Sequence, residues 1–324
     1  MKFTEAQLQE YASPISQSED QKCKNAISMV RDAMTLIGYS DGGKEIRSFE
    51  ADTFSYALDM SANYGTRQIT ILVQGSYANK TNIPSKSDVD VAVILESTFI
   101  PVYRSGVSAA DYGFSDGAYT VQELKNDVHR ALQVKFNSQG VARHDKCIKV
   151  TGNSYRVDAD VVPAYRYRNY LNDYNNNPDN YIGGIDIRPD SGGSIVNYPE
   201  QHIRNGIAKN KVAGYNFKRC VRIVKNMKEL MEKNGLYVSP LIKSFGLESL
   251  LWNGENAAYT KYSSILRYTF DEVIKYLKGD FGSFSKYKEA NGIKSLFPYD
   301  GGNSIAAYQQ FVTDLSSFFE YDIS

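Results

Sequence analysis

The stretch that decides the fold is residues 74–93, QGSYANKTNIPSKSDVDVAV. It follows a short β-branched run, residues 68–73, which predicts a strand. Gly75 lets the backbone approach a bound group closely. Ser76 offers a hydroxyl and a backbone N–H at a helix start, where the helix dipole favours anions. The opening of the stretch therefore has the properties of a phosphate-binding turn.

Two aspartates, Asp88 and Asp90, begin the apolar run that ends the stretch. Because side chains alternate along a strand, both carboxylates are expected on one face, while Val89 and Val91 point into the core. Neighbouring carboxylates repel each other, and a divalent cation relieves that repulsion. A Gly-Ser turn or an Asp-x-Asp pair alone is common, so the signal lies in their order and spacing.

Length and composition limit the function classes. A chain of 324 residues predicts two lobes, and the balance of 37 basic and 37 acidic residues argues against a large exposed basic surface. The first residues lack the sections of a secretory signal, and no apolar run is long enough to span a bilayer, so we expect a cytoplasmic protein. Three scattered cysteines and three scattered histidines predict neither a disulfide framework nor a zinc site.

Hydrophobic periodicity outlines the remaining elements. We expect an aromatic- and glycine-rich surface loop over 99–119 and a hairpin of two strands over 183–188 and 194–197. Helices are predicted over 18–37, 49–64, 121–136, 215–233, 262–277 and 304–319, with a further helix starting at residue 200.

The strand, the Gly-Ser helix start and the Asp-x-Asp pair twelve residues later resemble the DNA polymerase β-like nucleotidyltransferase superfamily. The full string GSYANKTNI…SDVDVAV is similar to one branch, the bacterial CD-NTases, relatives of cyclic GMP-AMP synthase and oligoadenylate synthase. That resemblance predicts a third carboxylate before an apolar pair and Pro-Ala. In YRVDADVVPA, residues 155–164, Asp160 matches the third metal ligand. Asp158 is the weaker candidate, with a salt-bridged neighbour as its alternative.

The resemblance implies that Asp88, Asp90 and Asp160 hold two Mg²⁺ ions, with Mn²⁺ as an alternative, in oxygen coordination shared with a nucleoside triphosphate. It also implies that Lys225 reaches the triphosphate from a helix, that Ser244 contacts the phosphates, and that Phe245 stacks on the base. By residue type alone, Phe245 is equally well explained as a core residue.

An aromatic and basic alternation follows the third carboxylate, in the run from Tyr165 to Tyr170. Arg166 and Arg168 could touch phosphates while the tyrosines stack on bases. The alternative is a sheet edge covered by arginine side chains.

We therefore predict an α/β (α+β) fold with two lobes and a central active-site cleft. Residues 1–198 would form a polymerase β-like nucleotidyltransferase core with a mixed β-sheet. Residues 199–324 would form a helical lobe like that of oligoadenylate synthase, since the segment NYPEQH resembles the junction between the lobes in the CD-NTases.

The predicted activity is synthesis of a cyclic di- or trinucleotide second messenger from nucleoside triphosphates and Mg²⁺, with release of pyrophosphate. Cyclisation and a role in CBASS antiphage defence, through a separate effector protein, are implied by the resemblance. We expect a monomer with no membrane partner and no obligatory DNA, because the zinc insertion of the animal relative is absent from the sequence. An activating RNA or ligand, the bases and the linkage stay open.

Two alternatives accompany this prediction. One is a template-independent nucleotidyltransferase that acts on a nucleic acid or a small acceptor. The other is a catalytically silent nucleotide-binding module, against which the intact set Asp88, Asp90 and Asp160 weighs.

Overall fold

The computed structural model describes residues 2–49, 55–84, 88–262, 264–298 and 302–321. By its internal contacts the chain divides into two compact units. The first unit comprises Met1–Ile15, Asn79–Lys86 and Gln201–Ser324, and the second comprises Ser16–Ala78 and Ser87–Glu200. The sequence predicted one boundary, between residues 198 and 199. It did not group the first fifteen residues or the segment 79–86 with the C-terminal helices.

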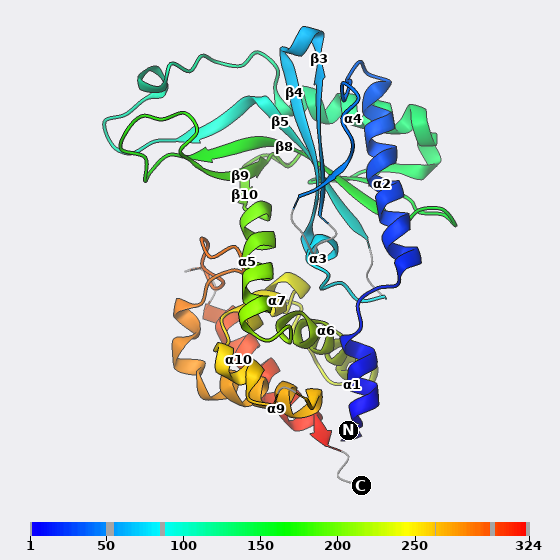
Figure 1. Ribbon diagram of the computed structural model, residues 1–324, viewed down its shortest axis with the longest axis vertical. Helices are drawn as coiled ribbons and strands as arrows, with labels where there is room; N and C mark the ends of the chain where they lie inside the picture. The colour runs from blue at the N-terminus through cyan, green and yellow to red at the C-terminus, as the bar shows by residue number, and fades with distance from the viewer. Residues whose placement is uncertain (1, 50–54, 85–87, 263, 299–301, 322–324) are drawn as a thin grey trace. The chain divides into compact units, whose positions relative to one another are not determined.

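The second unit is built on a mixed sheet, so the predicted α/β class is confirmed (Figure 1). Strand order is β10-β9-β8-β5-β4-β3-β2, and the short hairpin β6–β7 joins the sheet through β7 and β8. The strands are β2 (Arg47–Ser48), β3 (Tyr56–Ala62), β4 (Arg67–Gln74), β5 (Val89–Val102), β6 (Val141–Arg143), β7 (Ile148–Val150), β8 (Ala159–Asn169), β9 (Ile182–Ile187) and β10 (Ile195–Asn197).

Strands β5 and β8 run parallel, whereas β4 lies antiparallel to β5 and β9 lies antiparallel to β8. A parallel pair needs a crossover connection, and here helix α4 (Val121–Phe136) and the β6–β7 hairpin supply it. The predicted helix over 121–136 and the predicted hairpin of β9 and β10 are thereby confirmed.

The two faces of this sheet carry different side chains. Val150 of β7 and Ala159 of β8 face helices α4 and α2 (Gln17–Thr35). Residues of these two strands and two helices line one small cavity together. The opposite face of β5 and β8 presents a buried apolar cluster that includes Ala92, Ile94 and Val162. Because side chains alternate, Asp90 and Asp160 belong to this second face.

One prediction for the second unit is wrong, and another is only partly confirmed. Instead of a helix over 49–64, the chain forms β3 over Tyr56–Ala62, which pairs with β4 over Ala57–Ala62. Residues 50–54 of that predicted helix lie outside the described residues. The predicted surface loop 99–119 begins as the end of β5, and Tyr112 within it is buried against Tyr103 and Tyr170. In both cases long-range pairing or packing overrides the local sequence preference.

The first unit is helical around one apolar core. The expected apolar face of the 215–233 helix is confirmed, because Phe217, Val221, Val224, Met227 and Met231 are all fully buried. No helix among the described residues is long and apolar enough to cross a membrane. The elements are β1 (Lys2–Phe3), α1 (Glu5–Ala12), α5 (Pro199–Val212), α6 (Phe217–Lys233), α7 (Ser244–Trp252), α8 (Asn256–Thr260), α9 (Leu266–Gly279), α10 (Gly302–Phe318) and β11 (Glu320–Tyr321).

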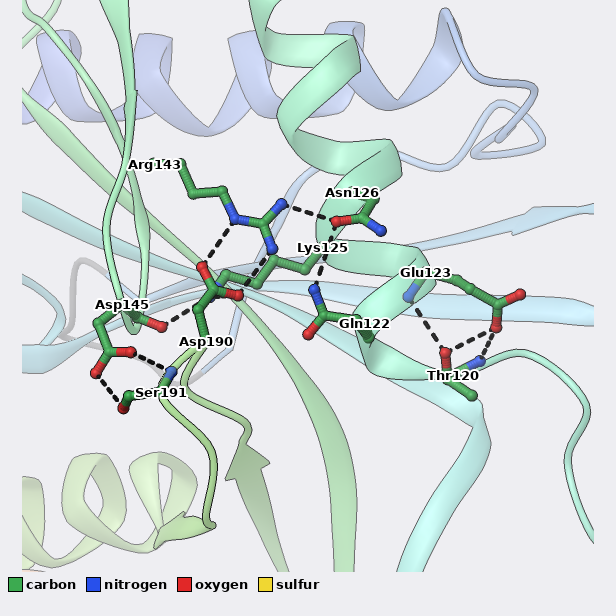
Figure 2. A network of polar contacts seen from close by, with 9 residues as sticks. All are labelled: Thr120, Gln122, Glu123, Lys125, Asn126, Arg143, Asp145, Asp190 and Ser191. Atoms are coloured by element: carbon green, nitrogen blue, oxygen red, sulfur yellow. Dashed lines mark hydrogen bonds and ion pairs between the residues drawn. The ribbon is translucent and has the colours of Figure 1, made fainter.

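A polar network fixes the β6–β7 hairpin within the second unit (Figure 2). Arg143 donates two hydrogen bonds of 2.8 Å to Asp190, and the buried ammonium of Lys125 lies 3.0 Å from the same carboxylate. Lys125 also donates to the carbonyl of Asp145, whose carboxylate accepts from the N–H of Ser191. The hydrogen bonds of Arg143, together with Lys125, hold the pKa of Asp190 well below its ordinary value. The network thus connects α4, the hairpin and the turn between β9 and β10.

Asp190→Ala is expected to lower the free energy of unfolding by about 2–4 kcal/mol, because it leaves the buried ammonium of Lys125 without its carboxylate. Urea denaturation followed by circular dichroism measures this change. The control is Asp179→Ala, which truncates an exposed carboxylate. Equal stabilities of the two variants would contradict the assignment.

Candidate active site

Four side chains form a row across the sheet. Backbone pairing places Gln74 of β4 opposite Asp90 of β5, Asp90 opposite Asp160 of β8, and Asp160 opposite Lys149 of β7. Neighbouring strands lie about 4.8 Å apart, so the carboxylates of Asp90 and Asp160 are close neighbours on one face. From here on, the term carboxylate row means only the three aspartates Asp88, Asp90 and Asp160. Asp88 belongs to it because it immediately precedes β5 and lies two residues before Asp90.

The Gly-Ser turn lies directly against this row. Gly75 begins the four-residue helix α3 (Gly75–Ala78) and has a φ of +73°, a conformation that L side chains rarely adopt. A Cβ atom at this position would lie 2.2 Å from Oδ2 of Asp90. Only glycine therefore allows the turn and the carboxylate to approach so closely. Ser76 follows as the second residue of α3.

The negative charges of the carboxylate row repel one another. Burial, followed by the negative charges of Asp160 and Asp88, raises the pKa of Asp90 to about 7. Burial and the charge of Asp88 also raise the pKa of Asp160. Both carboxyl groups thus favour a proton or a cation over an isolated negative charge.

Lys149 supplies a positive charge at the edge of the row. Its ammonium lies 3.0 Å from Oδ2 of Asp158 and 3.4 Å from Oδ2 of Asp88. Asp158 also accepts a 2.6 Å hydrogen bond from the N–H of Gly152, and these two contacts lower its pKa. The geometry favours the salt-bridged alternative for Asp158. The sequence had no signal for Lys149, because its position depends on the register between β7 and β8.

The donor chemistry of the row suits a hard divalent cation, which prefers several carboxylate oxygens. Within the ranges that the structure describes, no group of three or more His, Cys, Asp or Glu side chains is already gathered so that it could hold a metal ion. In this structure the carboxylate of Asp88 is paired with Lys149, 3.4 Å away. The residues fit a cation in charge and donor type, and Asp88 would have to turn toward it.

Arg166 and Arg168 are engaged by protein groups. Arg166 is buried, donates to Glu96 at 2.6 Å and to Glu200 at 2.9 Å, and its guanidinium is thereby held between two carboxylates. Arg168 lies over the ring of Phe99, 3.9 Å from its centroid. Both arrangements favour the structural alternative over a nucleotide contact.

The other three predicted residues belong to the first unit. Ser244 is exposed as the first residue of α7, and Phe245 beside it is 40% exposed, so its ring is not part of the core. The ring packs edge-on against His202 with a centroid distance of 5.1 Å. An exposed hydroxyl and an exposed ring at a helix start are available to a ligand.

Lys225 is placed differently, because its side chain is buried. Its ammonium donates to the carbonyl of Thr81 at 2.8 Å and lies 3.4 Å from Glu248. Glu248 is also bonded by His202 at 2.8 Å. From the sequence, no role was assigned to either partner: His202 is only the last residue of the NYPEQH junction segment, and Glu248 carries no pattern of its own.

Comparisons with known proteins extend over both units. Residues 204–320 match the family model of the cGAS/DncV-like nucleotidyltransferase C-terminal helical domain. The chain is 38% identical over 321 residues to cyclic GMP-AMP synthase CdnE03 of Staphylococcus schleiferi, covering 99% of this chain and 98% of that protein. It is 35% identical to a cyclic dipyrimidine nucleotide synthase CdnE of Cecembia lonarensis, covering 93% and 92%. The structure of Rhodothermus marinus CdnE c-UMP-AMP synthase with Apcpp and Upnpp matches with a TM-score of 0.75 and 27% identity, covering 97% and 96%.

Asp90→Asn is expected to raise the free energy of unfolding at pH 8 by roughly 1–2 kcal/mol when a chelator is present. The reason is that the carboxyl group titrates near pH 7 in the folded protein and near 3.8 in the unfolded chain, so its ionisation costs stability as the pH rises through this window. Urea denaturation at pH 8 and pH 5 measures the effect, which should shrink at pH 5.

Asp179→Asn, which alters an exposed carboxylate, serves as the control and should leave stability unchanged at both values. A loss of stability in Asp90→Asn at pH 8 would show that the buried charge is already compensated by protein groups.

Proposed function

The chain belongs to the cGAS/DncV-like nucleotidyltransferases, the CD-NTases, and we propose that it joins two nucleoside triphosphates into a cyclic dinucleotide with release of pyrophosphate. The observation that carries the proposal is the pairing of Asp90 with Asp160 directly beside the Gly75 turn. The relatives named as cyclic nucleotide synthases support it, because they match nearly the whole chain.

We assign the carboxylate row to two Mg²⁺ ions, with Mn²⁺ as a substitute. Asp88, Asp90 and Asp160 would supply the protein ligands. When bound, the ions would lower the pKa of the attacking ribose hydroxyl and neutralise charge on the triphosphate and the leaving pyrophosphate. Three carboxylates facing a triphosphate would otherwise repel it strongly.

The protein groups bind and orient the reactants. Gly75 and Ser76 present backbone N–H groups and a hydroxyl at the start of α3, which suits phosphate oxygens. The glycine also keeps this turn within contact of Asp90, so the phosphate-binding and carboxylate groups share one location. We infer phosphoryl transfer by positioning and electrostatics, without a covalent enzyme intermediate.

In the first unit, we assign Ser244 to a phosphate and the exposed ring of Phe245 to a base. Lys225 is assigned to the triphosphate by the family pattern. Because its ammonium is bonded to Thr81 and lies near Glu248, that role requires the side chain to leave these partners. The predicted domain division, with residues 199–324 as the nucleotide-closing helical lobe, belongs to the same proposal.

The bases do not transfer from the relatives, since one is named for GMP and AMP, another for pyrimidines and a third for UMP and AMP. We further propose that the product is a second messenger that acts on a separate effector in antiphage defence, as the family resemblance implies.

Incubation with Mg²⁺ and all four nucleoside triphosphates, without template or acceptor, is expected to yield a phosphatase-resistant dinucleotide detectable by mass spectrometry. Asp88→Ala combined with Asp90→Ala should lower the yield by roughly 10²- to 10³-fold or more, because the ion ligands are lost. Elongation of an added oligonucleotide without a small cyclic product would favour a template-independent transferase. Unchanged yield in the double variant would refute the metal assignment.

Gly75→Ala is expected to abolish product formation, because the added Cβ would overlap the carboxylate of Asp90. Gly113→Ala is a matched control: its φ of +68° imposes similar backbone strain, but no atom lies within 4 Å of the added Cβ. Both variants should lose about 1 kcal/mol of stability from the strained backbone. Retention of activity in Gly75→Ala, measured by pyrophosphate release, would contradict the proposed role of the turn.

A further inference from the structure

Lys149 places a positive charge beside the carboxylate row. It is the middle residue of β7, directly opposite Asp160 in the backbone register. Its ammonium lies 3.0 Å from Asp158 and 3.4 Å from Asp88, and so bridges a member of the carboxylate row and a residue outside it.

The strand that carries Lys149 is firmly held. Strand β7 pairs with β6 on one side and with β8 on the other, so its backbone is hydrogen-bonded along both edges. At the end of β6, beside the turn of the hairpin, Arg143 is bonded to Asp190, in the network that also includes Lys125 (Figure 2). A rigid hairpin therefore delivers the ammonium to the row, and only the flexible side chain is free to move between its two carboxylates.

Asp158 has the properties of an anchor for this ammonium. Its Oδ1 accepts from the N–H of Gly152 at 2.6 Å, which fixes the carboxylate independently of Lys149. Asp88, by contrast, is about half exposed and makes its contact to Lys149 at the longer distance. The ammonium can thus release Asp88 and keep Asp158.

We propose that Lys149 is a positioning residue that occupies Asp88 as a built-in counter-ion and yields this carboxylate to a divalent cation, while it stays paired with Asp158. The inference rests on the proposed function, in which the carboxylate row holds Mg²⁺. Two consequences follow. The ammonium stabilises the row before an ion binds, and it competes with the ion for Asp88, so free divalent cations bind more weakly than the bare carboxylates would allow.

The test is a Mn²⁺ titration at pH 7.5 without nucleotide, followed by the loss of the free Mn²⁺ electron paramagnetic resonance signal. Lys149→Met is expected to lower the Kd for Mn²⁺ roughly tenfold, because a positive charge beside the site is removed. Lys149→Arg keeps the charge and should stay near the wild type. Lys146→Met is the matched control, since it removes a lysine of the same hairpin that forms no ion pair with any described residue.

Thermal unfolding gives a second readout. Without metal, Lys149→Met should melt at a lower temperature than the wild type, because the carboxylates lose their counter-ion. Saturating Mn²⁺ should raise its melting temperature more than that of the wild type. Lys149→Gln repeats both measurements if the methionine variant folds poorly.

The variants Asp90→Asn and Asp160→Asn distinguish the role proposed for Lys149 from the metal assignment of the carboxylate row. If they weaken Mn²⁺ binding but Lys149→Met leaves the Kd unchanged or raises it, the role of Lys149 is refuted and the proposed function stands. If neither asparagine variant alters Mn²⁺ binding, the metal assignment of the carboxylate row falls, and the role of Lys149 falls with it.

Discussion

Repulsion between carboxylates on two neighbouring parallel strands is the constraint on which this molecule depends. Asp90 and Asp160 are paired in the register of β5 and β8, at a separation fixed by the backbone hydrogen bonds of the sheet. The strands cannot move apart without losing those bonds, so the charges stay together. Burial, together with the charges of Asp160 and Asp88, raises the pKa of Asp90 to about 7, so the row requires positive charge from another source.

Much of the second unit serves to bring compensating groups to this row. Gly75 permits the turn after β4 to touch Asp90, which places backbone N–H groups beside the carboxylates. The β6–β7 hairpin brings Lys149 to the other edge, and the pairing of Arg143 with Asp190 holds the hairpin in place. The groups proposed to bind phosphate and cations thus lie on adjacent strands of one sheet, as the proposed nucleotidyl transfer requires.

In the first unit, the buried carboxylate of Glu248 is likewise compensated by neighbouring polar and charged groups. Glu248 accepts from the hydroxyl of Thr81 at 2.6 Å and is bonded by His202, with Lys225 3.4 Å away. Burial alone would raise its pKa, but its interactions with His202, Lys225 and the hydroxyl of Thr81 lower it to about 2. Through Asn79 and Thr81, a segment that lies between two strands in the sequence is bound to helices α5, α6 and α7, and it groups with them.

The sequence by itself determined the elements whose signals are local: helix α4, the apolar face of α6, the β9–β10 hairpin, and the Gly-Ser and Asp-x-Asp motifs. The third carboxylate, Asp160, was predicted through the family resemblance. Only the tertiary structure decided that residues 56–62 form a strand, that Lys225 is buried beside Glu248, and that Lys149 reaches Asp88. The physical reason is that strand pairing and charge compensation join residues far apart in the chain. Their energy depends on register and burial, which no local pattern of residues contains.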